Sequence, residues 1–186
     1  VTYAWMVAWC SPEHMPYADL GARLLEQYYK VLSFTSGHMK MTRADILKAC
    51  IALKSRCYFL EPREENPTLH DLLDRCTPLL DQGLRGLVID PYGEFEHRIP
   101  DGMTETKYIS WLLGDIRAWA RKHSVHVWIV AHPTKIQKDD FGNYLVVKPY
   151  DISGSAAWFS KPDNILSVHR AFDQPDHTTI HIQKIK

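Results

Sequence analysis

The chain has 186 residues, of which 45% are hydrophobic, and this suffices to bury the core of one ordinary domain without disulfide or metal staples. Its 22 Lys and Arg residues balance its 22 Asp and Glu residues, so net charge indicates no nucleic-acid partner, and such a partner would need a local basic patch. No apolar run approaches the roughly 20 residues of a membrane span, and the apolar start at Val1 lacks the basic leader of a signal peptide.

Predicted strands and helices alternate along the chain. The first half contains, in order, a strand at 3–9, a helix at 17–30, a helix to about 55 with a capping box of Thr42 and Asp45, a strand at 57–60, and a helix at 67–83 that Thr68 and Asp71 open and Gly83 stops. The second half contains a strand at 86–90, a helix at 104–123, a strand at 125–131, and two strands at 164–170 and 178–185 that residues 173–176 join as a hairpin. This order predicts an α/β fold, a mostly parallel sheet with helices on both faces and an antiparallel hairpin edge.

Three of the predicted strands are apolar runs that each lead into a titratable residue. The run from Gly86 ends in Asp90, the run from His126 ends in His132, and the first strand leads through Cys10-Ser-Pro to Glu13. Buried parallel strands have this composition, and ligand sites of α/β proteins lie at the carboxyl ends of such strands. The pattern indicates a nucleotide-hydrolysing site.

The four cysteines show no metal-type spacing and stand in apolar or helical surroundings. They are Cys10, Cys50, Cys57 and Cys76. Buried, reduced thiols are the favoured interpretation over disulfides, which indicates a reducing compartment.

Four motifs occur in a recognisable order: Ser11-Pro-Glu13, Leu87-Val-Ile-Asp90-Pro91-Tyr92, Ala131-His132-Pro133-Thr134-Lys135, and Tyr150-Asp-Ile-Ser-Gly-Ser155. Together they resemble the motor domain of hexameric replicative DNA helicases, of the phage and bacterial primase-helicase and Twinkle type, with DnaB more distant. The resemblance implies one RecA-like domain over residues 1–186, as a fragment without the preceding phosphate-binding loop. It further implies ATP and Mg²⁺ as cofactors, single-stranded DNA as partner, a homo-oligomeric, hexameric ring, a fused or associated primase, and no membrane partner. The expected location is the cytoplasm of a bacterial or phage-infected cell, and a mitochondrion is the less favoured alternative.

The resemblance also assigns roles to the three titratable residues. Asp90 matches the Walker B aspartate that holds magnesium through water. Glu13 matches the catalytic glutamate that orients and deprotonates the attacking water. His132 matches a polar sensor of the γ-phosphate. The alternatives are a loop-capping aspartate, a glutamate in the first turn of a helix, and a core histidine.

The resemblance places a DNA-binding surface in the loop after His132 and in the following Gly-Ser turn. The candidates are the lysines and backbone amides of Lys135, Lys138, Gly154 and Ser155, with Lys148 in the same loop. Such groups would hold DNA phosphates without reading sequence. The alternative is an ordinary solvated loop. Trp158 and Phe159 are candidates for base stacking, although a place in a helix core is favoured for both.

Two features depart from the family pattern. No Gly-x-x-x-x-Gly-Lys-Ser/Thr occurs in the chain. The arginine finger, expected in a Lys-x-Arg pattern, reads Lys184-Ile-Lys186, so either Lys186 substitutes weakly or the finger is lost.

Two rival functions stay open at this point. One is a metal-dependent hydrolase, whose ligands would come from the acids and histidines Asp90, Glu94, Glu96, His97 and His132. The other is a RecA-like module that binds DNA or a partner subunit without hydrolysing a nucleotide.

Overall fold

A computed structural model describes residues 5–29, 42–61, 67–134, 136–153, 156–171 and 176–186. They fall into two compact units. Unit 1 comprises residues 1–96 and 123–130, and unit 2 comprises residues 97–122 and 131–186. The expectation of a single domain over 1–186 stays a prediction.

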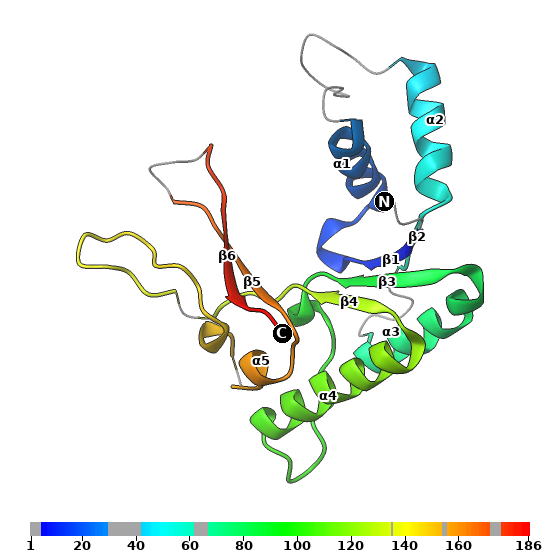
Figure 1. Cartoon of the computed structure of the whole chain (residues 1–186). Coiled ribbons are helices and arrows are strands. Elements are labelled where there is room, and N and C mark those ends of the chain that lie inside the picture. Colours follow the sequence, from blue (N-terminus) through cyan, green and yellow to red (C-terminus); the bar gives the residue numbers. More distant parts are fainter. Residues whose placement is uncertain (1–4, 30–41, 62–66, 135, 154–155, 172–175) are drawn as a thin grey trace. The chain divides into compact units, whose positions relative to one another are not determined.

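Unit 1 is built on a four-stranded parallel sheet. Its strands are β1 (Met6–Cys10), β2 (Cys57–Phe59), β3 (Leu84–Ile89) and β4 (His126–Ile129), in the order β2-β1-β3-β4 (Figure 1). Cys10 of β1 pairs with Ile89 of β3, and Ile89 pairs with Ile129 of β4. The predicted parallel sheet is confirmed, and these three strands end at one edge.

The inner strand β3 is buried on both faces from Gly86 onward, as its apolar run predicts. Leu84, Leu87 and Ile89 have no exposed surface. Gly86 lets the neighbouring strands pack closely, because a Cβ there would lie 3.0 Å from the Trp128 ring and 3.1 Å from a Val7 methyl carbon.

Helices flank the sheet of unit 1 on both sides. Figure 1 shows α1 (Tyr17–Tyr29) and α2 (Arg43–Lys54) on one side and α3 (Leu69–Cys76) on the other. Leu25 of α1 packs on Ala49 of α2. In α3 the buried side chains recur at helical spacing, at Leu69, Leu72, Leu73 and Cys76.

Both predicted helix starts with a Thr–Asp pair are confirmed as capping boxes. The Thr42 hydroxyl accepts from the backbone of Asp45, whose carboxylate accepts from the backbone of Thr42, and Thr68 and Asp71 repeat this pattern. The helix predicted over 67–83 is shorter, because Pro78 lacks the N–H that a continued α-helix needs. A 3-10 helix, Thr77–Gln82, replaces its end, and Gly83 follows with φ +91°.

The four cysteines are free, as predicted. Cys10 and Cys76 are buried and Cys57 is half-buried, but Cys50 is exposed. Its expected burial is wrong, because α2 turns Ile46, Ala49 and Leu53 toward α1 and Cys50 falls outside that stripe.

Unit 2 contains most of the long helix α4 (Glu105–His123), the short helix α5 (Ala157–Ser160), and the strands β5 (Ile165–His169) and β6 (Thr179–Lys184). The predicted antiparallel pair is confirmed, with Ser167 opposite His181. The two strands form a sheet of their own, not hydrogen-bonded to the parallel sheet among the described residues. Most of the predicted connection at 173–176 lies outside those residues.

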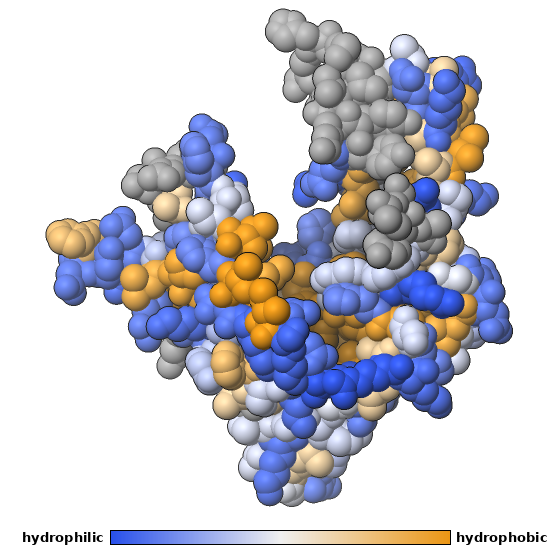
Figure 2. Space-filling view, in the orientation of Figure 1, coloured by the Kyte–Doolittle hydropathy of each residue, from blue (hydrophilic) through white to orange (hydrophobic). Residues whose placement is uncertain are grey.

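The two faces of the β5–β6 sheet differ in polarity. One face carries four aliphatic side chains that are 60–69% exposed, in the cross-strand pairs Leu166–Ile182 and Val168–Ile180 (Figure 2). On the other face, Ser167 and Gln183 both donate to the backbone oxygen of Val147, at 2.6 and 3.4 Å. These bonds attach the long loop after β4 to the sheet.

Within the described part of the chain, no helix has the length and apolar character needed to cross a membrane.

Candidate functional site

The carboxyl ends of β1 and β3 bring together two polar residues that lie 79 positions apart in the sequence. The backbone N–H of Asp90 donates to the oxygen of Cys10 at 2.9 Å, which continues the strand pairing past β3. The hydroxyl of Ser11 then donates to Oδ2 of Asp90 at 3.2 Å. Ser11 is fully buried, whereas the Asp90 side chain is 20% exposed. A buried hydroxyl therefore holds a carboxylate that solvent can reach.

His14 completes this group from the short 3-10 helix Pro12–His14. Its Nδ1 lies 2.8 Å from the Ser11 hydroxyl oxygen and 3.6 Å from Oδ2 of Asp90. In a Ser–His–Asp triad the histidine uses one ring nitrogen for each partner, but here the same nitrogen faces both. The buried hydroxyl is also out of reach of a substrate. The arrangement positions Asp90 and does not form a hydrolase nucleophile.

Tyr17 secures the turn that carries Ser11. Its hydroxyl accepts from the backbone N–H of Ser11 at 3.1 Å and donates to the oxygen of Leu60 at 2.9 Å, after β2. Burial raises the pKa of Tyr17 to about 12, although the Ser11 hydrogen bond works in the opposite direction. The phenol thus stays protonated and links the ends of β1 and β2.

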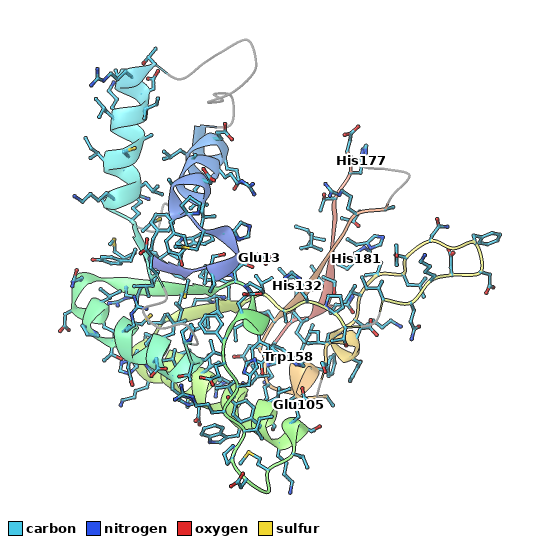
Figure 3. The ribbon with its side chains drawn as sticks, turned by 180° about the vertical axis from the view of Figure 1, so that it is seen from behind. Glu13, Glu105, His132, Trp158, His177 and His181 are labelled. Atoms are coloured by element: carbon cyan, nitrogen blue, oxygen red, sulfur yellow. The ribbon has the colours of Figure 1, made fainter. Side chains whose placement is uncertain are left out.

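Glu13 lies in the same turn, two residues after Ser11 (Figure 3). Its side chain is exposed, in contrast to that of Ser11. The carboxylate is therefore accessible to water and to a bound ligand, as a general base must be.

Pairing along β4 continues beyond the strand itself. The N–H of Val130 donates to the oxygen of Ile89 at 2.9 Å, and Val130 accepts from the N–H of Tyr92 at 2.8 Å. His132 follows two residues later, is exposed, and belongs to unit 2. Its predicted role as a phosphate sensor stays a prediction.

The donor set around Asp90 fits a magnesium ion held through water. Mg²⁺ keeps several waters and needs one or two carboxylates alongside substrate phosphates. Among the described residues, no three His, Cys, Asp or Glu side chains are grouped as direct metal ligands. The His97 ring, a candidate ligand in the rival hydrolase, packs edge-on against Tyr108, with 6.0 Å between ring centroids.

The predicted DNA-binding residues are only partly described. Lys135, Gly154 and Ser155 lie outside the described residues. Lys138 is exposed, with its ammonium 4.5 Å from the centre of the Tyr144 ring. Trp158 is buried, as expected of a helix-core residue, and its indole N–H donates to the oxygen of Ser153 at 3.3 Å.

Lys184, one of two candidate nucleotide-binding cations, has contacts within its own unit. Its ammonium donates to the backbone oxygens of Phe159, Ser160 and Pro162, at 2.7, 3.3 and 2.8 Å. Lys184 therefore caps the carboxyl end of α5.

Lys186 belongs to a cluster of cations around one carboxylate. Its ammonium lies 3.2 Å from Oδ1 of Asp163, which also accepts from Arg117 at 2.5 Å and lies 3.8 Å from Arg121. Burial raises the pKa of Asp163, but hydrogen bonds from Arg117 and Lys186 and their charges outweigh it, so the pKa is lowered. Three cations share one anion, and the cluster carries excess positive charge.

Comparison with known proteins shows what the chain resembles. The chain is 34% identical over 192 residues to the Twinkle homolog protein, chloroplastic/mitochondrial, of Arabidopsis thaliana. It matches a solved ATPase domain with a TM-score of 0.68 at 15% identity, over 97% of this chain and 67% of that one. The chain has the RecA-like fold of helicase ATPase domains. No protein-family model matches it.

A second solved structure supports the same fold for this chain. It is a DnaB-like replicative helicase, described with its interactions with primase, and matches with a TM-score of 0.67 at 14% identity, over 97% of this chain and 46% of that one. The Twinkle homolog match covers 98% of this chain but only 26% of that protein. The chain thus spans about a quarter of its curated relative.

Sequence reasoning missed three residues at this edge of the parallel sheet. The sequence indicates Ser11 only as part of a motif and Tyr17 only as the start of a helix. It does not single out His14. One signal was available: Ser11 and His14 flank Glu13 directly after a buried strand. The bond from Tyr17 to Leu60 had no sequence signal.

Proposed function

We propose that this chain is the motor of a replicative DNA helicase, which couples ATP hydrolysis at the subunit interfaces of a ring to movement along single-stranded DNA. The observation that carries the proposal is the shared edge of β1 and β3. There Ser11 holds Asp90, and Glu13 is exposed in the same turn. The similarity to the Twinkle homolog supports the same function.

In this proposal Asp90 would hold the magnesium of bound ATP through a water molecule. The ion, when bound, neutralises charge on the transferred phosphate. The Ser11 hydroxyl and His14 Nδ1 both face Oδ2 of Asp90, and this fixes the carboxylate before a ligand arrives. A preorganised carboxylate needs no reorganisation when the nucleotide binds.

Glu13 is the proposed general base. It would take a proton from the water that attacks the γ-phosphate, which requires an exposed, ionised carboxylate close to the ligand. His132 is proposed to donate a hydrogen bond to a phosphate oxygen. Lys184 and Lys186 are the proposed cations for a nucleotide, and of the two Lys186 lies in the cluster with excess positive charge.

The proposed partners follow the resemblance and the relatives. Single-stranded DNA would contact Lys135, Lys138, Gly154 and Ser155, and copies of the protein would assemble into a hexamer with a fused or associated primase. Location in the cytoplasm of a bacterial or phage-infected cell stays a prediction. The Arabidopsis relative is named chloroplastic/mitochondrial, so an organelle is the alternative location.

Two substitutions in the intact protein test the proposal. Glu13→Gln should keep ATP binding and lower steady-state hydrolysis about 10²- to 10⁴-fold, because an amide keeps the shape and loses the base. Asp90→Asn should raise the magnesium concentration needed for half-maximal turnover. Glu94→Gln is the matched control, since Glu94 is an exposed acid four residues after Asp90. A loss below about threefold for Glu13→Gln would reduce Glu13 to an acid at a helix start, short of the general-base range.

The contacts of Lys184 and Lys186 favour a second function, a RecA-like module that binds DNA or a partner subunit without hydrolysis. Both ammonium groups already have partners within unit 2. In such a module, the intact protein would bind single-stranded DNA and show no nucleotide turnover, so Glu13→Gln and Lys186→Ala would have no hydrolysis to lower.

A further inference from the structure

The last turns of α4 within unit 2 carry cations and no acid. From Arg117 to Lys122 the sequence reads Arg-Ala-Trp-Ala-Arg-Lys, and the nearest preceding acid is Asp115. Residues two apart on a helix do not share a face, whereas residues four apart do. Asp115 therefore lies on another side of α4 from Arg117, while Arg117 and Arg121 lie on the same face.

This face of α4 meets the carboxylate of Asp163, which gathers three cations around one oxygen atom. Oδ1 of Asp163 lies 2.5 Å from Nη2 of Arg117, 3.2 Å from the ammonium of Lys186 and 3.8 Å from Nη2 of Arg121. The cations come from α4 and from the residues after β6, which are far apart in the sequence. The fold, and not local sequence, brings their charges together.

Positive charge exceeds negative charge at this point of unit 2. Three cations against one carboxylate leave an excess of two positive charges. A fourth ammonium, that of Lys161, adjoins α4, since a Cβ on Gly114 would lie 3.7 Å from it. Cations held this close repel one another, so the cluster stabilises the fold less than separate ion pairs would. Such an arrangement favours a further anion.

Hydrogen-bond donors are also in excess in this cluster. The Nε atom of Arg117 is buried and has no acceptor among the residues that the structure describes. Arg121 is 3.8 Å from Asp163, too far for a hydrogen bond, and its guanidinium donates to no other described residue. The side chains of Arg121 and Lys186 are 65% and 49% exposed, so a ligand can reach both.

The chemistry of these two groups suits a phosphate. A guanidinium offers five N–H donors in a planar fork that matches two phosphate oxygens, and an ammonium adds a point charge. A terminal phosphate carries about two negative charges and three acceptor oxygens, whereas a side-chain carboxylate carries one charge. The excess of two positive charges therefore matches a terminal phosphate better than an acidic side chain.

We infer that Arg121, together with Lys186, binds the terminal phosphate of a nucleoside triphosphate. Helix α4 would thus supply the guanidinium that is missing from Lys184-Ile-Lys186. The inference rests on the proposed function and adds a residue to it. A guanidinium at this phosphate neutralises charge that develops during phosphoryl transfer. Asp163 and Arg117 are positioning residues, because they hold the two contacts in place without touching the phosphate.

Equilibrium binding to the intact protein tests this inference with two probes, the non-hydrolysable imido analogue of ATP and ADP, each with Mg²⁺. Arg121→Gln should weaken binding of the analogue about ten- to a hundredfold and that of ADP less than about twofold, because ADP lacks the third phosphate. Arg121→Lys should recover only part of the affinity for the analogue, since it keeps the charge and loses the fork. Lys122→Gln, which removes the adjacent exposed cation of α4, is the matched control and should change neither affinity.

Other outcomes overturn the inference. If Arg121→Gln weakens both nucleotides equally, or if Arg121→Lys binds the analogue as tightly as the unsubstituted protein, no guanidinium contacts the third phosphate. If Arg121→Gln behaves like Lys122→Gln while Glu13→Gln stops hydrolysis, the inference fails and the proposed function stands. If the unsubstituted protein binds neither nucleotide, both fail. Thermal denaturation should be nearly unchanged in every variant of Arg121, because an exposed side chain contributes little to stability.

Discussion

The parallel sheet of unit 1 and the antiparallel sheet of unit 2 bury their aliphatic residues very differently. In β3, Leu87 and Ile89 have no exposed surface, whereas Leu166 and Val168 of β5 are 60% and 69% exposed. A strand that is packed on both faces has its end fixed in one position. The polar residue that directly follows the strand is therefore fixed in position as well. This explains why Asp90 has fixed partners, while the hairpin of unit 2 serves to anchor a loop through Ser167.

The largest expected effect compares one leucine in each sheet. Leu87→Ala should lower the free energy of unfolding by about 2–5 kcal/mol, because it leaves a cavity in a close-packed core. Leu166→Ala, the matched control, should change it by less than about 0.5 kcal/mol, since the side chain is already in water. Urea denaturation of both variants measures the difference. Equal losses would show that the exposed face of the hairpin is covered in the intact protein.

Thiol labelling tests how well the parallel sheet buries the cysteines of unit 1. Burial raises the pKa of Cys10 from 9.0 to about 11 and that of Cys76 to about 12, whereas Cys50 is exposed. At pH 8, the raised pKa leaves Cys10 with about a hundredfold less thiolate than a thiol of pKa 9.0, and the buried Cys10 should be labelled by a disulfide reagent far more slowly than the exposed Cys50. Fast labelling of all four cysteines in the native protein would mean that the edge of β1 opens readily.

The same shift has a consequence for stability at alkaline pH. Native Cys10 keeps its proton up to about pH 11, while the unfolded thiol loses it near 9.0. The contribution of Cys10 to the free energy of unfolding is fully present below about pH 9 and is lost as the pH rises toward 11. The unfolding free energy of Cys10→Ala should fall less steeply over that window than that of the unsubstituted protein.

Ser11→Ala probes the group that the buried sheet positions. It removes the hydroxyl that donates to Asp90 and lies 2.8 Å from His14, and should lower the unfolding free energy by about 1–3 kcal/mol. The magnesium dependence of nucleotide turnover should shift in the direction expected for Asp90→Asn, but less. Thr77→Val is the control, because it also removes a hydroxyl, one that donates to Leu73 of α3. Unchanged magnesium dependence would show that Ser11 serves packing alone.

The smallest expected effect lies in unit 2. Lys184→Met keeps the aliphatic stem and removes the ammonium that caps α5, and should cost about 0.5–1.5 kcal/mol of stability. If nucleotide turnover in the intact protein falls much more than stability does, Lys184 acts on the nucleotide despite its carbonyl contacts. Steady-state hydrolysis and thermal denaturation of one preparation separate the two.

The order and type of the main elements could be read from the sequence, because they depend on local patterns. Apolar runs of four to six residues predicted β1, β3 and β4, and the Thr42–Asp45 and Thr68–Asp71 pairs marked two helix starts within one turn. Errors came where local signals compete: Pro78 converted the end of one predicted helix into a 3-10 helix, and Cys50 turned away from the α1–α2 contact.

The residues that end the strands were also determined by the sequence alone, since the carboxyl ends of parallel strands meet at one edge whatever their spacing. Only the tertiary structure decided which side chains hold them. Ser11 and Asp90 are 79 positions apart, and Tyr17 and Leu60 are 43 apart, so no periodicity links either pair. The same applies to Lys184, whose ammonium group contacts the end of α5, and to Lys186, whose ammonium group contacts Asp163. Each partner lies about 20 residues earlier in the sequence. Such contacts depend on strand register and on where a turn places one atom, which neighbouring residues do not encode.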